Sequence, residues 1–241
     1  MEAVHQPAPL AGEHEDWLHR LGVSLSASKW SESLQGIVGK LALNTPLDLE
    51  DGVVLFNHPD LHELGALANA VREARFGRQA FFNSNVHINQ TNICVLACRF
   101  CAFRRGPKAD DAYAMSVDEY VADLAQYAHA VDEVHSVGGL HPEWGVEHYE
   151  SLFRRVSDEH PHVSIKALTA VEIKHLAQRS SISTLVVLKR LRQAGLMSLP
   201  GGGAEILDDE VRAVICNGKE SSEEYIPVSY THLTLPTRRG V

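Results

Sequence analysis

The sequence has few basic residues for its length. Lysine and arginine total 22 of 241 residues, against 31 aspartates and glutamates, so the formal net charge is −9. Because binding to nucleic-acid phosphates requires a basic face, we do not expect nucleic acid to be a partner. The remaining composition, 44% hydrophobic and 22% charged, is typical of a globular protein that can bury a core.

Long hydrophobic runs are also missing. No stretch approaches about 18 consecutive apolar residues, so we expect no membrane span. The first 17 residues are acidic and lack the apolar segment of a signal peptide. Four cysteines are too few for a disulfide scaffold. These absences predict a cytoplasmic protein, in a compartment where thiols stay reduced.

The N-terminal region is predicted to be helical after a loose start. Residues 1–29 are expected to form a loose tail, and residues 30–78 a helical layer. Within that layer, Asp48 is a candidate N-cap. A further helix is expected over Asp60–Arg75, with Gly77 placed to end it. These helices precede the first segment with a strand pattern, so we interpret them as a layer separate from the core.

From residue 79 the sequence alternates between strand and helix patterns, which predicts an α/β fold. The expected strands are Ala80–Asn89, Glu133–Val137, Val163–Leu168 and Leu196–Leu199, and the expected helices cover residues 116–127, 146–159, 183–194 and 204–215. Four such units in succession imply a parallel sheet with right-handed crossovers. Periodicity does not decide between an open doubly wound sheet and a barrel. Both architectures place ligands at the carboxyl ends of the strands.

Three cysteines follow the first predicted strand at C-x3-C-x2-C spacing: Cys94, Cys98 and Cys101. Thiolates are soft ligands, which favour iron–sulfur clusters, zinc or Cu(I). A structural zinc site needs four ligands, usually in two separated pairs, and no second pair follows. Three thiolates on a [4Fe–4S] cluster leave one iron free to bind a small molecule, whereas electron-transfer clusters usually take four cysteines. The spacing therefore favours a cluster with an open iron.

Several other polar residues can be interpreted in two ways. His87 or His135 could complete a zinc site with the three cysteines, giving a non-catalytic metal-binding protein. His87 and Asn89 share one face of a strand, where they could contact a ligand or form a structural pair. Glu205 could bind ribose hydroxyls or favour the start of a helix. Arg104 and its neighbour Arg105 could pair with substrate carboxylates or lie in a solvated basic loop.

With Phe100 as the aromatic residue, the cysteine motif resembles the C-x3-C-x-aromatic-C motif of the radical S-adenosylmethionine (SAM) superfamily. Within the superfamily, the sequence resembles the aminodeoxyfutalosine synthases of menaquinone biosynthesis over roughly residues 30–226. The segments that carry this resemblance are Asn85–Cys94, Phe100–Arg105, Glu133–Pro142, Ile165–Ile173 and Ser198–Ile206.

The resemblance implies a partial (β/α)6 TIM-like barrel, of which this chain has about four β/α units. It implies a [4Fe–4S] cluster on the three cysteines, and SAM as a co-substrate bound near Phe100 and by the backbone of Gly138 and Gly139. It also implies a reducing partner such as flavodoxin or ferredoxin. The 5'-deoxyadenosyl radical of this family adds to a small-molecule substrate, 3-[(1-carboxyvinyl)oxy]benzoate, to form 6-amino-6-deoxyfutalosine. The cyclic futalosine-forming and deazaflavin-cofactor enzymes are the sibling alternatives.

The last residues depart from the family pattern. Residues 79–227 are expected to form a truncated radical SAM core, and residues 228–241 resemble a translated sequencing adaptor rather than a native tail. A four-unit core would lack the later strands of the barrel and the substrate contacts on them. We therefore expect the 241-residue chain to be unstable or inactive, although its parent enzyme is active.

Overall fold

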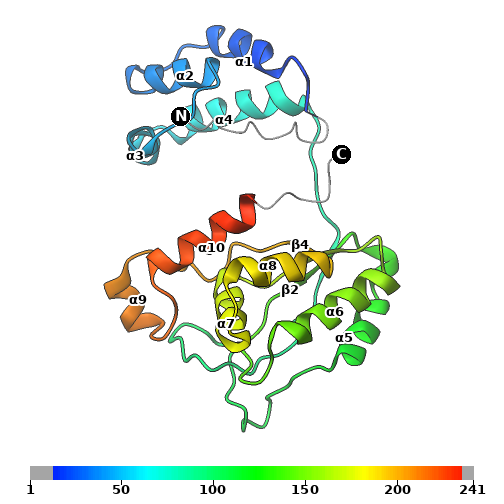
Figure 1. Cartoon of the computed structure of the whole chain (residues 1–241). Helices are drawn as coiled ribbons and strands as arrows, with labels where there is room; N and C mark the ends of the chain where they lie inside the picture. Colours follow the sequence, from blue (N-terminus) through cyan, green and yellow to red (C-terminus); the bar gives the residue numbers. More distant parts are fainter. Residues whose placement is uncertain (1–12, 235–241) are drawn as a thin grey trace. The chain divides into compact units, whose positions relative to one another are not determined.

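The computed structural model describes residues 13–234, which fall into two compact units (Figure 1). The units divide between Phe82 and Asn83, slightly after the boundary expected at residue 78. Each unit has a hydrophobic core of its own. The units are therefore described separately.

The first unit is a small helical bundle. Its helices are α1 (Trp17–Ser26), a 3₁₀ turn (Glu32–Leu34), α2 (Gln35–Ala42), α3 (Leu49–Asn57) and α4 (Leu61–Phe76). Helix α1 packs on α4, and Leu21 and Leu25 of α1 are buried in the core of the unit. The predicted loose tail over residues 1–29 is therefore wrong for residues 17–26. Leucines four residues apart give α1 a buried face, and a helix with such a face is stabilised by packing.

Local sequence signals set the ends of α3 and α4 as predicted. Asp48 caps α3 in a reciprocal capping box: its side chain accepts from the Asp51 N–H, and the Asp51 carboxylate accepts from the Asp48 N–H. Asp60 caps α4 by accepting from the N–H groups of residues 62 and 63. Gly77 ends α4 at φ 58°, a conformation that favours glycine.

The second unit is built on one parallel sheet of four strands in the order β1-β2-β3-β4. The strands are β1 (Asn85–His87), β2 (Glu133–Ser136), β3 (Ser164–Ala167) and β4 (Leu196–Ser198). The helices are α5 (Val117–Ala125), a 3₁₀ turn (Ala128–Ala130), α6 (Val146–Glu159), α7 (Ala170–Ser180), α8 (Thr184–Gln193), α9 (Asp209–Ile215) and α10 (Ser222–Thr234). All strands are parallel neighbours in sequence order, which is the order of a barrel segment rather than of a doubly wound sheet.

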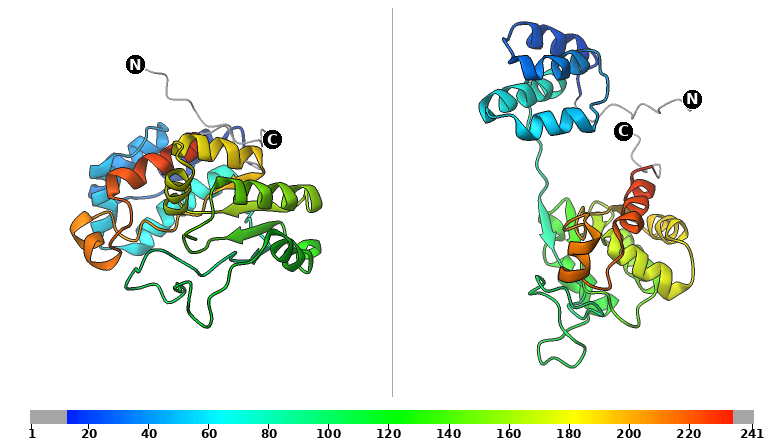
Figure 2. Two further views of the ribbon diagram at one scale, coloured as in Figure 1. Left: turned by 60° about the horizontal axis from the view of Figure 1, so that its bottom comes forward. Right: turned by 90° about the vertical axis from the view of Figure 1, so that its left-hand side faces the viewer.

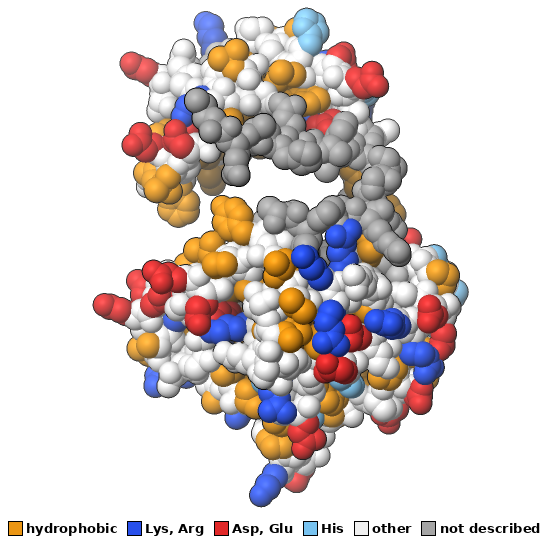
Figure 3. All heavy atoms as spheres, in the orientation of Figure 1, with side chains coloured by type: hydrophobic (Ala, Val, Ile, Leu, Met, Phe, Trp, Pro, Cys, Tyr) orange, Lys and Arg blue, Asp and Glu red, His pale blue; other side chains and the backbone are white. Residues whose placement is uncertain are grey.

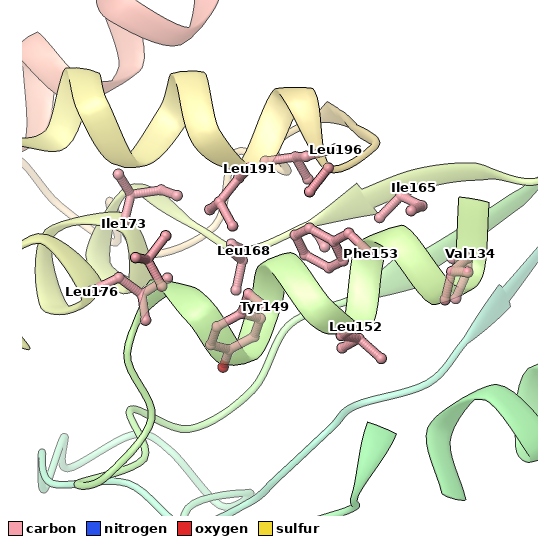
Figure 4. Close-up of a cluster of buried hydrophobic side chains, with 14 of the residues drawn as sticks. Val134, Tyr149, Leu152, Phe153, Ile165, Leu168, Ile173, Leu176, Leu191 and Leu196 are labelled. Carbon is pink, nitrogen blue, oxygen red and sulfur yellow. The ribbon is translucent and has the colours of Figure 1, made fainter. Parts of the chain in front are cut away.

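The core of the second unit lies between the sheet and helices α5 to α8. Val134, Ile165 and Leu196 point from the strands toward Phe153 of α6 and Leu191 of α8 (Figure 4). The strands contribute alternate residues to this core, because side chains of a strand alternate between its two faces. Helices covering one face of a consecutive parallel sheet give the partial TIM-like barrel, which confirms the expected fold class with four of its strands.

Several predicted boundaries in the second unit need correction. The strand pattern over Ala80–Asn89 yields only β1, and the helix begun by the Ser116 capping box ends at Ala125 instead of Tyr127. The helix predicted over residues 204–215 begins at Asp209, because Gly203 and Glu205 have positive φ and Asp208 is the N-cap. Helix α7 was not predicted, although Thr169 and Glu172 form its capping box. Residues 228–234 continue α10, and residues 235–241 lie outside the described part.

Acidic and basic side chains are mixed on the face of the second unit that Figure 3 shows. Within residues 13–234, no helix combines the length and the hydrophobicity needed to cross a membrane.

Candidate functional site

The three cysteines lie on a long connection between β1 and α5, which runs as irregular loops away from the sheet (Figure 2). Buried polar residues at its start fold this connection: the Asn92 side chain donates to the Asp111 carbonyl and accepts from the Tyr113 N–H, each at 2.8 Å. Backbone bonds then fix the cysteine segment, since Cys94 N–H donates to the Arg105 carbonyl at 3.0 Å. Hydrogen bonds among the loop's own polar groups therefore fix its conformation.

All three cysteines of the loop are free thiols and half-buried. Burial raises the pKa of the Cys98 thiol, and the Lys219 ammonium opposes this rise. Across the described residues, no three His, Cys, Asp or Glu side chains converge so as to hold one metal ion.

Gly138 and Gly139 pack directly against the cysteine loop, after the end of β2. Gly139 N–H donates to the Thr91 carbonyl at 2.9 Å. A Cβ on Gly139 would lie 2.2 Å from the Ile93 carbonyl oxygen and 3.0 Å from Cys94 Cβ. Only glycine leaves room for this approach, so the backbone of the pair lies beside the first cysteine. The structure thus brings together Cys94 and the two glycines that the sequence singled out.

A buried polar network contacts the backbone of the glycine pair, and its contacts are not apparent from the sequence. Glu172, fully buried at the start of α7, accepts from Gly138 N–H at 3.0 Å with one oxygen. Its other oxygen accepts from the N–H and hydroxyl of Thr169 at 2.6 and 2.9 Å. Burial raises the pKa of Glu172 to about 7, although these hydrogen bonds oppose the rise. Its capping box was readable in the sequence, whereas its contact with Gly138 was not.

Gln90, at the end of β1, extends the same network. Its amide group donates to Tyr149 at 3.1 Å, and its carbonyl oxygen accepts from the Ser136 hydroxyl at 2.7 Å. A Cβ on Gly138 would lie 2.7 Å from the Gln90 amide nitrogen. Buried side chains therefore link the segments at or just after the ends of β1, β2 and β3, next to the glycine pair.

Residues after α9 lie on the other side of the cysteine loop. Arg99 N–H donates to the Ile215 carbonyl at 2.8 Å, next to the buried Cys216. The Lys219 ammonium lies 5.5 Å from the ring centre of Phe100, which is about half exposed. Lys219 also pairs with Glu205 at 2.9 Å. The sequence did not single out Lys219, since a lone lysine between a buried cysteine and a buried glutamate carries no motif.

Other candidate residues take structural roles or lie apart. Arg104 donates to the Leu96 carbonyl at 2.7 Å, and Arg105 pairs with Asp111 at 2.6 Å, so both help to fold the loop. Asn89 accepts from the Val137 N–H at 3.3 Å. His87 lies on β1, and its ring stacks on that of its neighbour on β2. A cleft of about 120 Å³ between Leu96 and α7 is smaller than the roughly 300–1,000 Å³ of small-molecule sites.

The fold and the loop together define a class of protein: a partial parallel barrel with three free thiols at the carboxyl ends of its strands. The number and softness of these donors fit a cluster with one open iron. The chain belongs to the radical SAM superfamily, whose family model matches residues 88–228.

Named relatives of the chain fall into several branches of the superfamily. It is 38% identical over 83% of its length to the aminodeoxyfutalosine synthase of Thermus thermophilus, and 41% identical over 74% to that of Streptomyces coelicolor. It is 34% identical over 81% of its length to the cyclic dehypoxanthine futalosine synthase of Streptomyces coelicolor. These matches cover 55%, 46% and 50% of the relatives, so the chain spans about half of their length.

Solved structures share the fold at low sequence identity. Methylornithine synthase (PylB) matches 88% of the chain and 55% of its own with a TM-score of 0.58 and 16% identity. HydG, a maturase of the [FeFe]-hydrogenase, matches 93% of the chain and 49% of its own with a TM-score of 0.63 and 12% identity. These likenesses support the barrel fold of the chain.

Proposed function

We propose that this chain holds a [4Fe–4S] cluster on Cys94, Cys98 and Cys101 and presents its open iron to SAM. The observation that carries the proposal is the contact of Gly139 with Ile93 and Cys94, which places bare backbone beside the first thiol. When bound there, the cluster would pass one electron to SAM and so supply a 5'-deoxyadenosyl radical and methionine, and an electron donor of the flavodoxin or ferredoxin type would provide the electron. The protein positions the reactants and limits solvent access, while the cofactor carries the difficult chemistry.

Each residue around the loop has a specific task in this proposal. The Gly138 and Gly139 backbone would accept hydrogen bonds from the methionyl amino group of SAM. Glu172 fixes that backbone by accepting the Gly138 N–H at 3.0 Å. The ring of Phe100, which is about half exposed, would offer an apolar surface to SAM.

We further propose that the full-length enzyme adds this radical to the enol-ether double bond of 3-[(1-carboxyvinyl)oxy]benzoate. Rearrangement and loss of the enol-ether carboxylate would then give 6-amino-6-deoxyfutalosine for menaquinone biosynthesis. Support comes from two aminodeoxyfutalosine synthases at 38% and 41% identity. The sibling reactions are the alternative, because relatives named for them are equally similar. Identity is 34% to a cyclic dehypoxanthine futalosine synthase, 36% to the FO synthase of Mycobacterium tuberculosis, and 43% over 65% of the chain to the 5-amino-6-(D-ribitylamino)uracil–tyrosine 4-hydroxyphenyl transferase of Methanoculleus marisnigri.

Product analysis separates these reactions. The product of the intact gene, reconstituted with iron and sulfide without oxygen, is incubated with SAM, dithionite and one acceptor at a time. The expected result is a SAM-derived adduct with 3-[(1-carboxyvinyl)oxy]benzoate, detected by liquid chromatography and mass spectrometry. An adduct formed with 5-amino-6-(D-ribitylamino)uracil and tyrosine instead would overturn the assignment.

The 241-residue chain itself has four of the barrel's strands in its described part. We propose that it forms little or no product, because the contacts expected from later strands are not supplied. Robust product formation by the purified 241-residue chain in the same assay would contradict this.

A further inference from the structure

The face of the sheet that points away from helices α5 to α8 carries a row of polar side chains. The strand register aligns His87 of β1 with His135 of β2, Lys166 of β3 and Ser198 of β4. Their strand neighbours, including Val134 and Ile165, enter the hydrophobic core, so the row faces the opposite side. Adjacent strands lie about 4.8 Å apart, so the row offers hydrogen-bonding groups over about 10 Å from β1 to β3.

The polar groups of this row do not satisfy all of one another's hydrogen bonds. The imidazoles of His87 and His135 stack, with ring centres 4.7 Å apart and planes 18° apart. His135 Nε2 is buried and has no hydrogen-bond partner. The Lys166 ammonium lies 3.9 Å from the Glu133 carboxylate, which is beyond ordinary hydrogen-bond length. A buried nitrogen without a partner calls for a ligand or water that would satisfy it.

The Lys166 ammonium is the cation beside His135 that can attract an anion. His135 faces the Lys166 ammonium, the Glu133 carboxylate and the imidazole of His87. Burial lowers the pKa of His135, His87 and Lys166 lower it further, and Glu133 opposes them. This favours the neutral imidazole, which can donate one hydrogen bond. Glu133 is nearly buried, whereas the Lys166 side chain is one-third exposed and can reach a ligand.

We propose that Lys166 and His135 bind a carboxylate of an aromatic acid, whose ring lies over the stacked imidazole of His87. Lys166 supplies the positive charge and His135 Nε2 a directed hydrogen bond. Glu133 holds Lys166 loosely and competes with the ligand for its charge. This inference rests on the proposed function, because it assigns the carboxylate-binding residues for the aromatic dicarboxylate acceptor.

The test uses isophthalate, a stable aromatic dicarboxylate, and its uncharged diamide as probes on the 241-residue chain by calorimetry. Isophthalate is expected to bind and the diamide is not. Lys166→Met is expected to weaken isophthalate binding about tenfold or more, since it removes a charged hydrogen bond. Lys189→Met, which removes an exposed lysine of α8, is the matched control and leaves binding unchanged.

A second variant is expected to change the affinity for isophthalate in the opposite direction. Glu133→Gln removes the competing carboxylate and is expected to tighten isophthalate binding about threefold or more. A merely structural role of Glu133 would weaken binding or leave it unchanged. The Glu133→Gln measurement still tests the proposal if circular dichroism shows that Lys166→Met does not fold.

The outcomes separate this inference from the proposed function. Calorimetry is done on cluster-free protein, so a failure to assemble the cluster counts against the proposed function alone. The inference is overturned if wild-type chain does not bind isophthalate, if the diamide binds equally well, or if Glu133→Gln weakens binding while the control does not.

Discussion

Glu172 is predicted to make the stability of the second unit depend on pH. Its carboxyl is fully buried, and its pKa is raised from 4.5 to about 7 by burial. A carboxyl whose folded pKa lies above its unfolded pKa stays protonated longer in the folded state. Stability is then highest below about pH 4.5, where both states are protonated, and falls as the pH rises toward 7. Above about pH 8 both states are ionised and the loss is complete.

The size of the effect follows from the two pKa values. Each pKa unit corresponds to about 1.4 kcal/mol, so the change from 4.5 to about 7 corresponds to about 3 kcal/mol. Most of this loss, about 2 to 3 kcal/mol, falls between pH 5 and pH 8. It is large beside a typical total stability of about 5–15 kcal/mol.

The assay compares wild-type chain with Glu172→Gln, whose side chain does not titrate. Urea unfolding of both proteins at several pH values gives the difference in free energy of unfolding, in which other titrating groups cancel. Glu172→Gln is expected to gain about 2 to 3 kcal/mol relative to wild type between pH 5 and pH 8. A difference that stays constant over this range would refute the reasoning, because Glu172 would then have the same pKa in both states.

Two further substitutions test the structure around the loop. Gly139→Ala places a Cβ 2.2 Å from the Ile93 carbonyl oxygen and should abolish incorporation of iron and sulfide, whereas Gly201→Ala, with open space at its Cβ, should not; equal iron contents would contradict the close approach. Arg212→Met should destabilise the chain by about 3–5 kcal/mol in urea unfolding, because the buried guanidinium donates to the carbonyls of residues 204, 206 and 220. The control Arg179→Met, at an exposed site, should change stability by less than about 0.5 kcal/mol, and similar losses for both variants would argue against the buried role.

Local sequence signals predicted those elements whose ends are set locally. Ser116 with Glu119, and Asp60 with Gly77, mark helix ends because caps satisfy backbone groups within a few residues. Helix α7 was missed although Thr169 and Glu172 carry the same capping signature. This signal is local, as is the leucine spacing of α1.

The fold class followed from the alternation of strands and helices, but strand lengths did not. Residues 80–84 have a strand pattern, yet β1 pairs with β2 only over residues 85–87. Pairing depends on the neighbouring strand, which sequence periodicity does not contain. The late start of α9 has a similar cause, because Glu205 adopts φ 55° in the loop that Lys219 and Arg212 contact.

For the candidate site as well, the sequence predicted the local features but not the contacts between distant segments. The spacing of the three cysteines placed them on one loop after β1, which is where they lie. The role of Glu172 under Gly138, and the row from His87 to Lys166, depend on strand register and on contacts between distant segments. These contacts between distant segments carry no local motif, so only the folded chain shows them.

The most direct test of the account is the iron and sulfide content of the 241-residue chain after anaerobic reconstitution, with electron paramagnetic resonance of the reduced protein before and after SAM is added. The account predicts about four irons and four sulfides per chain, loss of both in Cys94→Ala, Cys98→Ala and Cys101→Ala, retention in Cys216→Ala, and a spectrum that SAM changes. Colourless protein containing zinc, or a cluster that needs Cys216 and does not respond to SAM, would contradict it.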